Sequence, residues 1–178
     1  MNYSRTVLAT CAWMMLSGMS NSAVAQTVSV KNEYGRIHFN NDKGEEKCTL
    51  AIPTTSQIFN FGANNEYCEN NMASTFWLEN VPSATLIQFY ENDTCSDGKS
   101  SDNFYFKLKT VKQPTDWSQS PNPAATLSVD TLRNSKAGEL IPKKNVRIED
   151  AYVGAGLATK NLNERLSCVY IERSQPVN

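Results

Sequence analysis

The chain has 178 residues, of which 17 are lysine or arginine and 18 are aspartate or glutamate, and its formal net charge is −1. Apart from a small group at residues 143–147, the basic residues are dispersed. The chain therefore lacks the basic patch with which proteins bind nucleic acid or anionic membranes, and we expect neither as a partner.

The first 25 residues have the pattern of a secretory signal peptide. Arg5 provides a positive start, residues 7–19 are mostly apolar, and a small-x-small cleavage signal ends at Ala25. The apolar run is too short to span a bilayer permanently. We expect a mature chain of residues 26–178 without an integral membrane segment, located in the periplasm or secreted. The short charged start is typical of bacterial export.

The residues that follow alternate between apolar and polar with the period of β-strands. The alternating runs are rich in aromatic and β-branched residues, and Gly, Asn, Asp, Ser and Pro lie between them. Many short strands at this spacing predict one all-β domain, a sandwich or a barrel. The expected strands, in chain order, are 28–30, 37–39, 50–52, 58–61, 76–78, 86–90, 104–108, 127–129 and 169–171.

Two later segments do not follow this pattern. Residues 151–162 contain helix formers, but Gly154 and Gly156 weaken a helix there. Residues 113–124 contain three prolines and no apolar period, which predicts an ordered loop or insertion. Trp117 in this loop is either a plug that fills the core, which is the favoured interpretation, or an exposed anchor for a partner.

Four cysteines follow the predicted cleavage site: Cys48, Cys68, Cys95 and Cys168. An even number in an oxidising compartment predicts two disulfides. A four-cysteine metal site would need close pairs such as C-x-x-C, which these cysteines do not form. The sequence allows three pairings. The preferred prediction is Cys68–Cys95 with Cys48–Cys168, which would tie the early part of the chain to its end.

A polar turn, a strand and an aromatic-Tyr-Glu motif follow one another between Cys68 and Gly98. The turn reads NNMAST over residues 70–75, and the strand with its motif reads LIQFYE over residues 86–91. This segment resembles the Greek-key unit of the βγ-crystallin family, whose turn has the form N/D-N/D-x-x-S/T-S. A looser match covers residues 161–171, with Glu164 where Asn or Asp is usual and Cys168 where Ser is usual.

The resemblance implies a Greek-key sandwich, with an insertion around residues 102–159, in which the two turns together cradle Ca²⁺. Ca²⁺ takes six to eight hard oxygen ligands, and Glu164 is the one anionic side chain among the implied ligands, so such a site would be weak. The alternative is that both turns only shape the fold. The implied ligands are Asn70, Asn71 and Ser74 from the first turn and Asn163, Glu164 and Ser167 from the second.

No sequence signature of catalysis is present. The single histidine, His38, lies in an alternating run, where a surface or packing role is more common than a catalytic one. There is no Gly-rich phosphate loop and no G-x-S-x-G motif. The carboxylates at 45–46, 91–97 and 149–150 lie beside turn residues, as solvated loops do, although a carboxylate pair for glycoside hydrolysis stays open.

We therefore expect an exported, non-enzymatic protein that binds a protein or a cell surface, with Ca²⁺ as its candidate cofactor. Asp93, Asp97 and Trp117 are its candidate interaction residues. An alternative hypothesis is a secreted inhibitor or toxin-like effector that acts on another cell or on a protease. An inhibitor should present a rigid, exposed loop near a disulfide, and residues 92–102 beside Cys95 are where we expect it.

Overall fold

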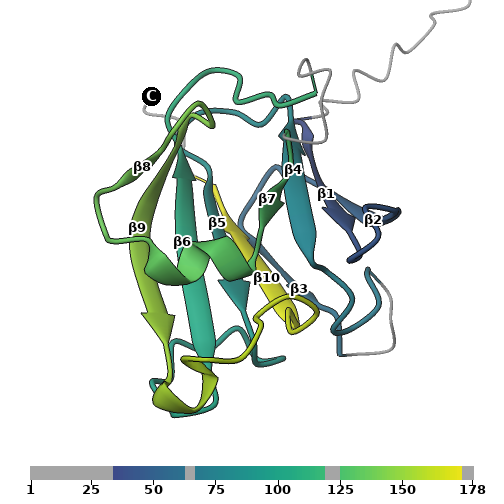
Figure 1. Ribbon diagram of the computed structural model, residues 1–178. Helices are drawn as coiled ribbons and strands as arrows, with labels where there is room; N and C mark the ends of the chain where they lie inside the picture. The colour runs from purple at the N-terminus through teal and green to yellow at the C-terminus, as the bar shows by residue number, and fades with distance from the viewer. Residues whose placement is uncertain (1–33, 63–66, 119–124, 174–178) are drawn as a thin grey trace, which may run out of the picture. The chain divides into compact units, whose positions relative to one another are not determined.

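Two antiparallel β-sheets form the body of the protein (Figure 1). The structure is a computed structural model, which describes residues 34–62, 67–118 and 125–173. These residues all belong to one unit, Asn32–Asn178. The predicted signal peptide and the strand expected at 28–30 lie outside the described residues.

The first sheet has four strands in the order β2-β1-β4-β7, and the second has six in the order β3-β10-β5-β6-β9-β8. Two short 3₁₀ helices, η2 and η3, flank β8 and β9 in the chain. The elements are β1 (Arg36–Asn40), β2 (Glu46–Ala51), β3 (Gln57–Asn60), β4 (Thr75–Glu79), β5 (Leu86–Tyr90), β6 (Phe104–Thr110), β7 (Leu127–Ser128), η2 (Asp130–Asn134), β8 (Leu140–Ile141), β9 (Val146–Val153), η3 (Ala155–Leu157) and β10 (Cys168–Glu172).

The predicted all-β class is confirmed, and so is each predicted strand within the described residues. Strands β8 and β9 were not predicted. In β9, alternation is interrupted by the charged run at 149–150, where a bulge in the pairing with β6 shifts the register between Lys107 and Leu108. The helix formers at 151–153 are the end of this strand, and the helical segment that follows is only the short η3.

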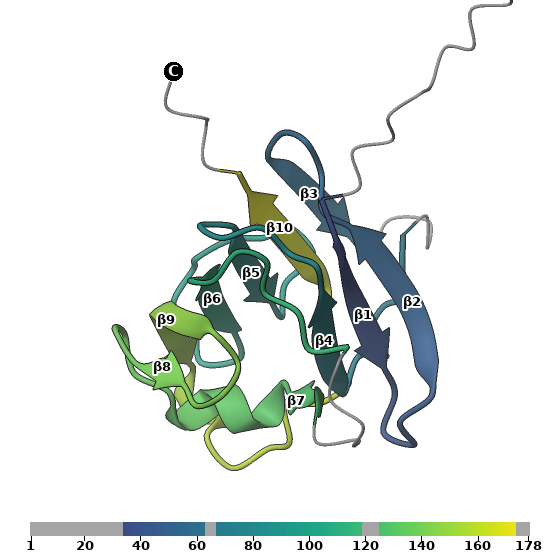
Figure 2. The same cartoon turned by 90° about the horizontal axis from the view of Figure 1, so that it is seen from above.

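The first half of the chain contains β1–β4 and the second half contains β5–β10. The third strand of each half lies in the sheet that is formed mainly by the other half. Strand β3 follows β1 and β2 in the chain, yet it pairs with β10 in the second sheet. Strand β7 follows β5 and β6, yet it pairs with β4 in the first sheet. Figure 2 shows both exchanged strands beside their partners. The two halves are therefore bound to each other by backbone hydrogen bonds as well as by their shared core.

Aromatic side chains from both sheets fill the space between them. Phe76 of β4 packs edge-on against Phe89 of β5, with ring centroids 4.8 Å apart, and Phe39 of β1 lies 5.9 Å from the same ring. Trp117 is 4% exposed, and its Nε1 donates a hydrogen bond to the Lys144 carbonyl oxygen at 2.8 Å. The plug interpretation of Trp117 is confirmed, and its assignment as a surface interaction residue is wrong.

The two disulfides join Cys48 to Cys68 and Cys95 to Cys168, with Cα atoms 5.6 and 5.4 Å apart. The preferred prediction of Cys68–Cys95 with Cys48–Cys168 is therefore wrong. Each bridge closes within its own half of the chain. Cys168 lies opposite Tyr90 across β5 and β10, so the chain leaving β5 passes over β10 within reach of that cysteine.

Removing one bridge at a time should separate their contributions. A cross-link between more distant residues restricts the unfolded chain more, so Cys95→Ala with Cys168→Ala (separation 73 residues) should lower the free energy of unfolding by about 1 kcal/mol more than Cys48→Ala with Cys68→Ala (separation 20). Urea unfolding of the oxidised protein measures both. A non-reducing peptide map that links Cys68 to Cys95 would contradict the pairing.

Candidate functional site at the paired turns

The two turns that resemble each other in sequence lie against each other in space. The Asn71 amide donates to the Leu166 carbonyl oxygen at 3.2 Å, and the Glu164 amide donates to the Ala73 carbonyl oxygen at 2.9 Å. Asn71 and Glu164 occupy the second position of their turns and share a left-handed backbone, with φ of 57° and 60°. The two turns are therefore related as equivalent halves of one motif.

Side chains repeat this reciprocity. The Ser167 hydroxyl donates to Asn71 Oδ1 at 3.2 Å, and the Ser74 hydroxyl donates to Glu164 Oε1 at 3.5 Å. Both serines are buried, with exposed fractions of 1% for Ser74 and 6% for Ser167. Four of the six ligands implied by the resemblance are thus brought together in two cross-turn pairs.

The backbone of each serine also joins three elements. The Ser74 amide donates to the Asn40 carbonyl oxygen at the end of β1, and the Ser167 amide donates to the Tyr90 carbonyl oxygen at the end of β5. Each serine carbonyl oxygen then accepts from the residue at the end of an exchanged strand: Val129 after β7 for Ser74, and Phe61 after β3 for Ser167. The paired turns are the junction at which both sheets meet.

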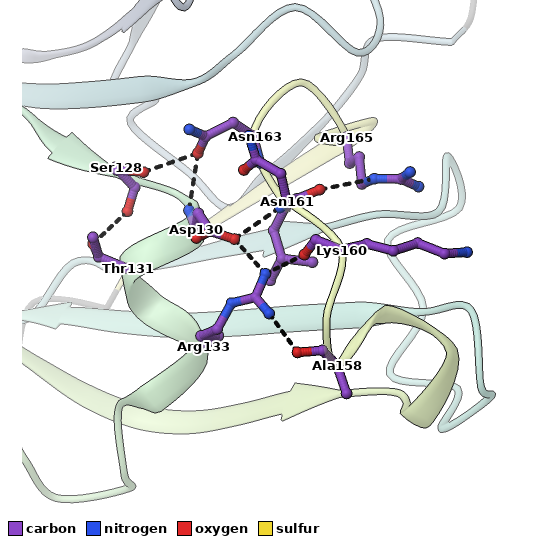
Figure 3. A network of polar contacts seen from close by, with 10 residues as sticks. Ser128, Asp130, Thr131, Arg133, Ala158, Lys160, Asn161, Asn163 and Arg165 are labelled. Carbon is purple, nitrogen blue, oxygen red and sulfur yellow. Dashed lines mark hydrogen bonds and ion pairs between the residues drawn. The ribbon is translucent and has the colours of Figure 1, made fainter.

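The first residues of the two turns differ in their roles. Asn163 Oδ1 accepts hydrogen bonds from the Ser128 hydroxyl at 2.9 Å and from the Asp130 amide at 3.0 Å (Figure 3). It is engaged in holding the start of η2. Asn70 Oδ1 is buried and has no hydrogen-bond partner within the described chain. An unpartnered buried amide oxygen is costly and is the kind of group that a bound cation would satisfy.

A polar network fixes the segment that leads into the second turn. Asp130 accepts from the Leu162 amide at 2.9 Å and from the Arg133 guanidinium. Arg133 also donates to the carbonyl oxygens of Ala158, at 2.7 Å, and Lys160. Figure 3 shows the guanidinium directed from η2 toward these groups. The second turn is therefore positioned by residues about 30 positions earlier in the chain.

Beside the paired turns lies a polar hollow of about 420 Å³, lined by Asn71, Glu91, Asn161, Asn163, Glu164 and Arg165. Glu91 was missed as a site residue, although it ends the aromatic-Tyr-Glu motif in the sequence. Desolvation by burial raises the pKa of Glu91, the nearby Arg165 lowers it and the Asp102 charge raises it, with a net upward shift. Carboxyls with perturbed pKa values are frequent at functional sites.

The donor set of this hollow is suited to a hard cation that binds weakly. Two carboxylates, Glu91 and Glu164, line it together with the amide side chain of Asn71, and the cationic Arg165 beside them opposes a metal ion. The described residues contain no group of three or more His, Cys, Asp or Glu side chains that could hold a metal. Neutral oxygens would therefore have to supply most of the ligands, as Ca²⁺ tolerates and transition metals do not.

His38 lies on the opposite face of the first sheet from the core, where it packs against its neighbours. Its ring stacks on Trp77 at 3.6 Å between centroids. Nδ1 is 3.1 Å from a Glu46 oxygen and from the Thr49 hydroxyl, and Nε2 is 3.1 Å from a Glu79 oxygen. The exposed fraction of His38 is 8%, so its ring is largely covered by these neighbours.

The two acidic interaction candidates lie on the loop after β5. Asp93 and Asp97 are exposed, and Asp97 pairs with the Lys107 ammonium at 2.6 Å. Asn92, which begins an Asn-Asp-Thr glycosylation sequon, uses its side chain inside this loop, donating to Asn103 Oδ1 and the Ser96 carbonyl oxygen. The loop is thus an exposed but ordered surface.

Comparison with protein-family models, with curated proteins and with solved structures finds no match to this chain. Among the described residues, no helix has the length and apolar character needed to cross a membrane.

Glu91→Gln should raise the thermal midpoint of the metal-free protein at neutral pH. Because burial raises the pKa of Glu91 above its ordinary 4.5, the stability that this carboxyl contributes is complete below its unfolded pKa and is lost as the pH rises through its folded pKa. The advantage of glutamine should therefore vanish below about pH 4.5. Thermal unfolding followed by circular dichroism across this pH range measures it.

The matched control is Glu139→Gln, which removes a carboxylate near β8, away from the hollow. It should not reproduce the gain at neutral pH. A Glu91→Gln variant that is less stable than the parent protein at neutral pH would contradict the environment assigned to Glu91.

Proposed function

We propose that this is an exported, non-enzymatic binding protein with a βγ-crystallin-like Greek-key fold, whose paired turns hold a weak Ca²⁺ site. The strand exchange and the equivalent turns at 70–75 and 163–168 support this fold. Two disulfides, together with the predicted signal peptide, support export to an oxidising compartment. Binding, not catalysis, is proposed because the one histidine is engaged in packing and the cysteines form bridges.

The reciprocal contacts of the two turns are the observation that carries the calcium proposal. They place the oxygens of Asn71, Ser167, Ser74 and Glu164 in two pairs at the junction of the sheets. A cation there would replace hydroxyl donors as the partner of Asn71 and Glu164, and would offset the desolvation of Glu91 next to them. Ca²⁺ would thereby brace the junction between the two halves.

Binding of Ca²⁺ to this site can be measured without a partner protein, through its effect on the stability of the fold. A ligand that binds the folded chain and not the unfolded chain raises stability in proportion to the logarithm of its concentration above its Kd. Sites on extracellular modules bind Ca²⁺ with Kd values of about 10⁻⁴–10⁻³ M. The expected effect thus lies in the millimolar range.

Adding millimolar Ca²⁺ to the chelator-treated protein should raise its thermal midpoint, and Glu164→Gln should abolish most of the rise, since it removes an anionic ligand. Glu139→Gln, the matched loss of one carboxylate elsewhere, should leave the rise intact. Mg²⁺, which demands a tighter octahedral geometry, should act more weakly. An unchanged midpoint in millimolar Ca²⁺ would show that the turns serve the fold alone.

A specific observation favours a second candidate function, a secreted inhibitor or toxin-like effector. The loop over residues 93–102 is mostly exposed, is attached to the six-stranded sheet by the Cys95–Cys168 disulfide and is braced by the side chains of Asn92 and Asn103 at its ends. Inhibitors present this combination of exposure and rigidity, because a preorganised loop loses little conformational entropy on binding. Asp93 and Asp97 belong to this same surface.

A further inference from the structure

The segment from Cys95 to Ser101 is exposed and has no regular secondary structure apart from a turn at its end, yet it is fixed along its length. Cys95 anchors its start through the disulfide to Cys168, which is completely buried at the beginning of β10. Just before it, Asn92 Oδ1 accepts from the Ser96 amide and Asn92 Nδ2 donates to the Ser96 carbonyl oxygen, both at 2.8 Å.

The following carbonyl groups are held in turn. Asn103, whose Oδ1 accepts from Asn92, donates from its Nδ2 to the Gly98 carbonyl oxygen. The Tyr152 hydroxyl of β9 donates to the Ser100 carbonyl oxygen at 2.9 Å. The Gly156 amide donates to the Ser101 carbonyl oxygen at 2.8 Å. The carbonyl oxygens of Gly98, Ser100 and Ser101 are therefore tied to the body of the protein.

The floor beneath this segment is rigid. Tyr90, Tyr105 and Tyr152 lie opposite one another on β5, β6 and β9, and the rings of Tyr105 and Tyr152 stack with centroids 5.8 Å apart. Backbone also closes in at Gly154, where a Cβ atom would lie 2.2 Å from the Ser100 carbonyl oxygen. A side chain at position 154 would push the segment away, so the glycine at this position allows the segment to lie close to the end of β9.

Lys99 stands between the two tied residues, Gly98 and Ser100, and its side chain is exposed. Its ammonium lies 5.7 Å from the centroid of the Tyr152 ring, and it forms no ion pair within the described ranges. A weak contact of this kind with the half-buried Tyr152 ring does not prevent the Lys99 side chain from turning outward. The loop thus presents a basic side chain from a fixed backbone.

We propose that residues 97–101 dock in the active-site cleft of a serine endopeptidase that cleaves after basic residues, with Lys99 in its acidic specificity pocket. The proposal rests on the second candidate function, the inhibitor. Asp97 is paired with Lys107 at 2.6 Å, so the acidic residue nearest to Lys99 on its N-terminal side is already neutralised and does not oppose the acidic pocket.

The ties on both sides of Lys99 explain why such a protease would be inhibited. The protease serine oxygen attacks the Lys99 carbonyl carbon, the bond to the Ser100 nitrogen breaks, and that nitrogen takes the proton carried by the protease histidine. Gly98 on one side and Ser100 on the other stay attached to the scaffold, so the new amine remains beside the acyl-enzyme. Its high effective concentration favours reformation of the peptide bond over hydrolysis by water.

The test uses the oxidised mature chain in a buffer containing a calcium chelator, with a trypsin-type protease and a small chromogenic lysine substrate. We expect competitive inhibition. Lys99→Ala should weaken it by more than about tenfold, the loss typical of an interface anchor, while Lys112→Ala, at another exposed lysine, should leave it unchanged. Thermal unfolding of both variants checks that they are folded.

A second variant tests the tie on the leaving side. Tyr152→Phe removes the hydroxyl that holds Ser100, so the variant should still bind at first but should accumulate chain cleaved between Lys99 and Ser100, as detected by mass spectrometry. Equal cleavage in the parent protein and in this variant would contradict the role of Tyr152.

The outcomes separate the inference from the functions on which it rests. The role of Lys99 is overturned if the Lys99→Ala variant inhibits the trypsin-type protease as well as the parent protein does. It is also overturned if the protease cleaves the parent protein without being inhibited. If the protein inhibits a chymotrypsin-type protease and not the trypsin-type enzyme, the role of Lys99 is wrong but the inhibitor function is retained. If it inhibits neither protease, both the role of Lys99 and the inhibitor function are overturned. Because the chelator removes Ca²⁺, none of these results depends on the calcium site.

Discussion

The exchange of third strands is the constraint from which the rest of this structure follows. Because β3 pairs with β10 and β7 pairs with β4, each half of the chain must cross to the other sheet and return. The turn at 70–75 lies on the return of the first half from β3 to β4. The second half returns after β7 through η2 to β8 and β9, and the turn at 163–168 then leads into β10, so that both turns lie where the sheets meet. Their reciprocal hydrogen bonds are thus a consequence of topology, which brings two copies of one polar turn to the same junction with opposite polarity. A ligand held there would act on the contact between the halves, not on one sheet alone.

The disulfides connect residues within each half of the chain, whereas the paired turns connect the two halves. Cys48–Cys68 closes the part of the first half that contains the exchanged strand β3, whereas Cys95–Cys168 closes the corresponding part of the second half and also anchors the exposed loop that follows β5. Covalent ties therefore act within each half, and hydrogen bonds and apolar packing act between the halves. This separation leaves the loop after Cys95 fixed to the scaffold while it contributes little to the shared core, which is the condition under which a surface can vary without loss of the fold.

Local pattern in the sequence was sufficient for most of the strands and for the polar turns. Alternation in Thr75–Glu79 reflects one buried face, and the left-handed Asn71 is a conformation that asparagine tolerates. Contacts between distant residues could not be obtained this way. The disulfide pairing depends on the path of the chain over β10, and the role of Asn163 depends on Ser128 and Asp130, more than 30 positions away. Glu91 was visible as part of a motif, but its place beside the second turn requires the fold.

The two turns are equivalent in backbone but not in side chains, and this asymmetry bears on what the junction can bind. At the second position one turn has the neutral Asn71 and the other the anionic Glu164. At the first position, Asn163 is saturated by its hydrogen bonds, while Asn70 has a buried oxygen without a partner in the described residues. The carboxylate of Glu91 adds its charge to the hollow beside Glu164. Negative charge is therefore concentrated on one side of the pseudo-symmetric motif, so the two equivalent positions differ in their attraction for a cation.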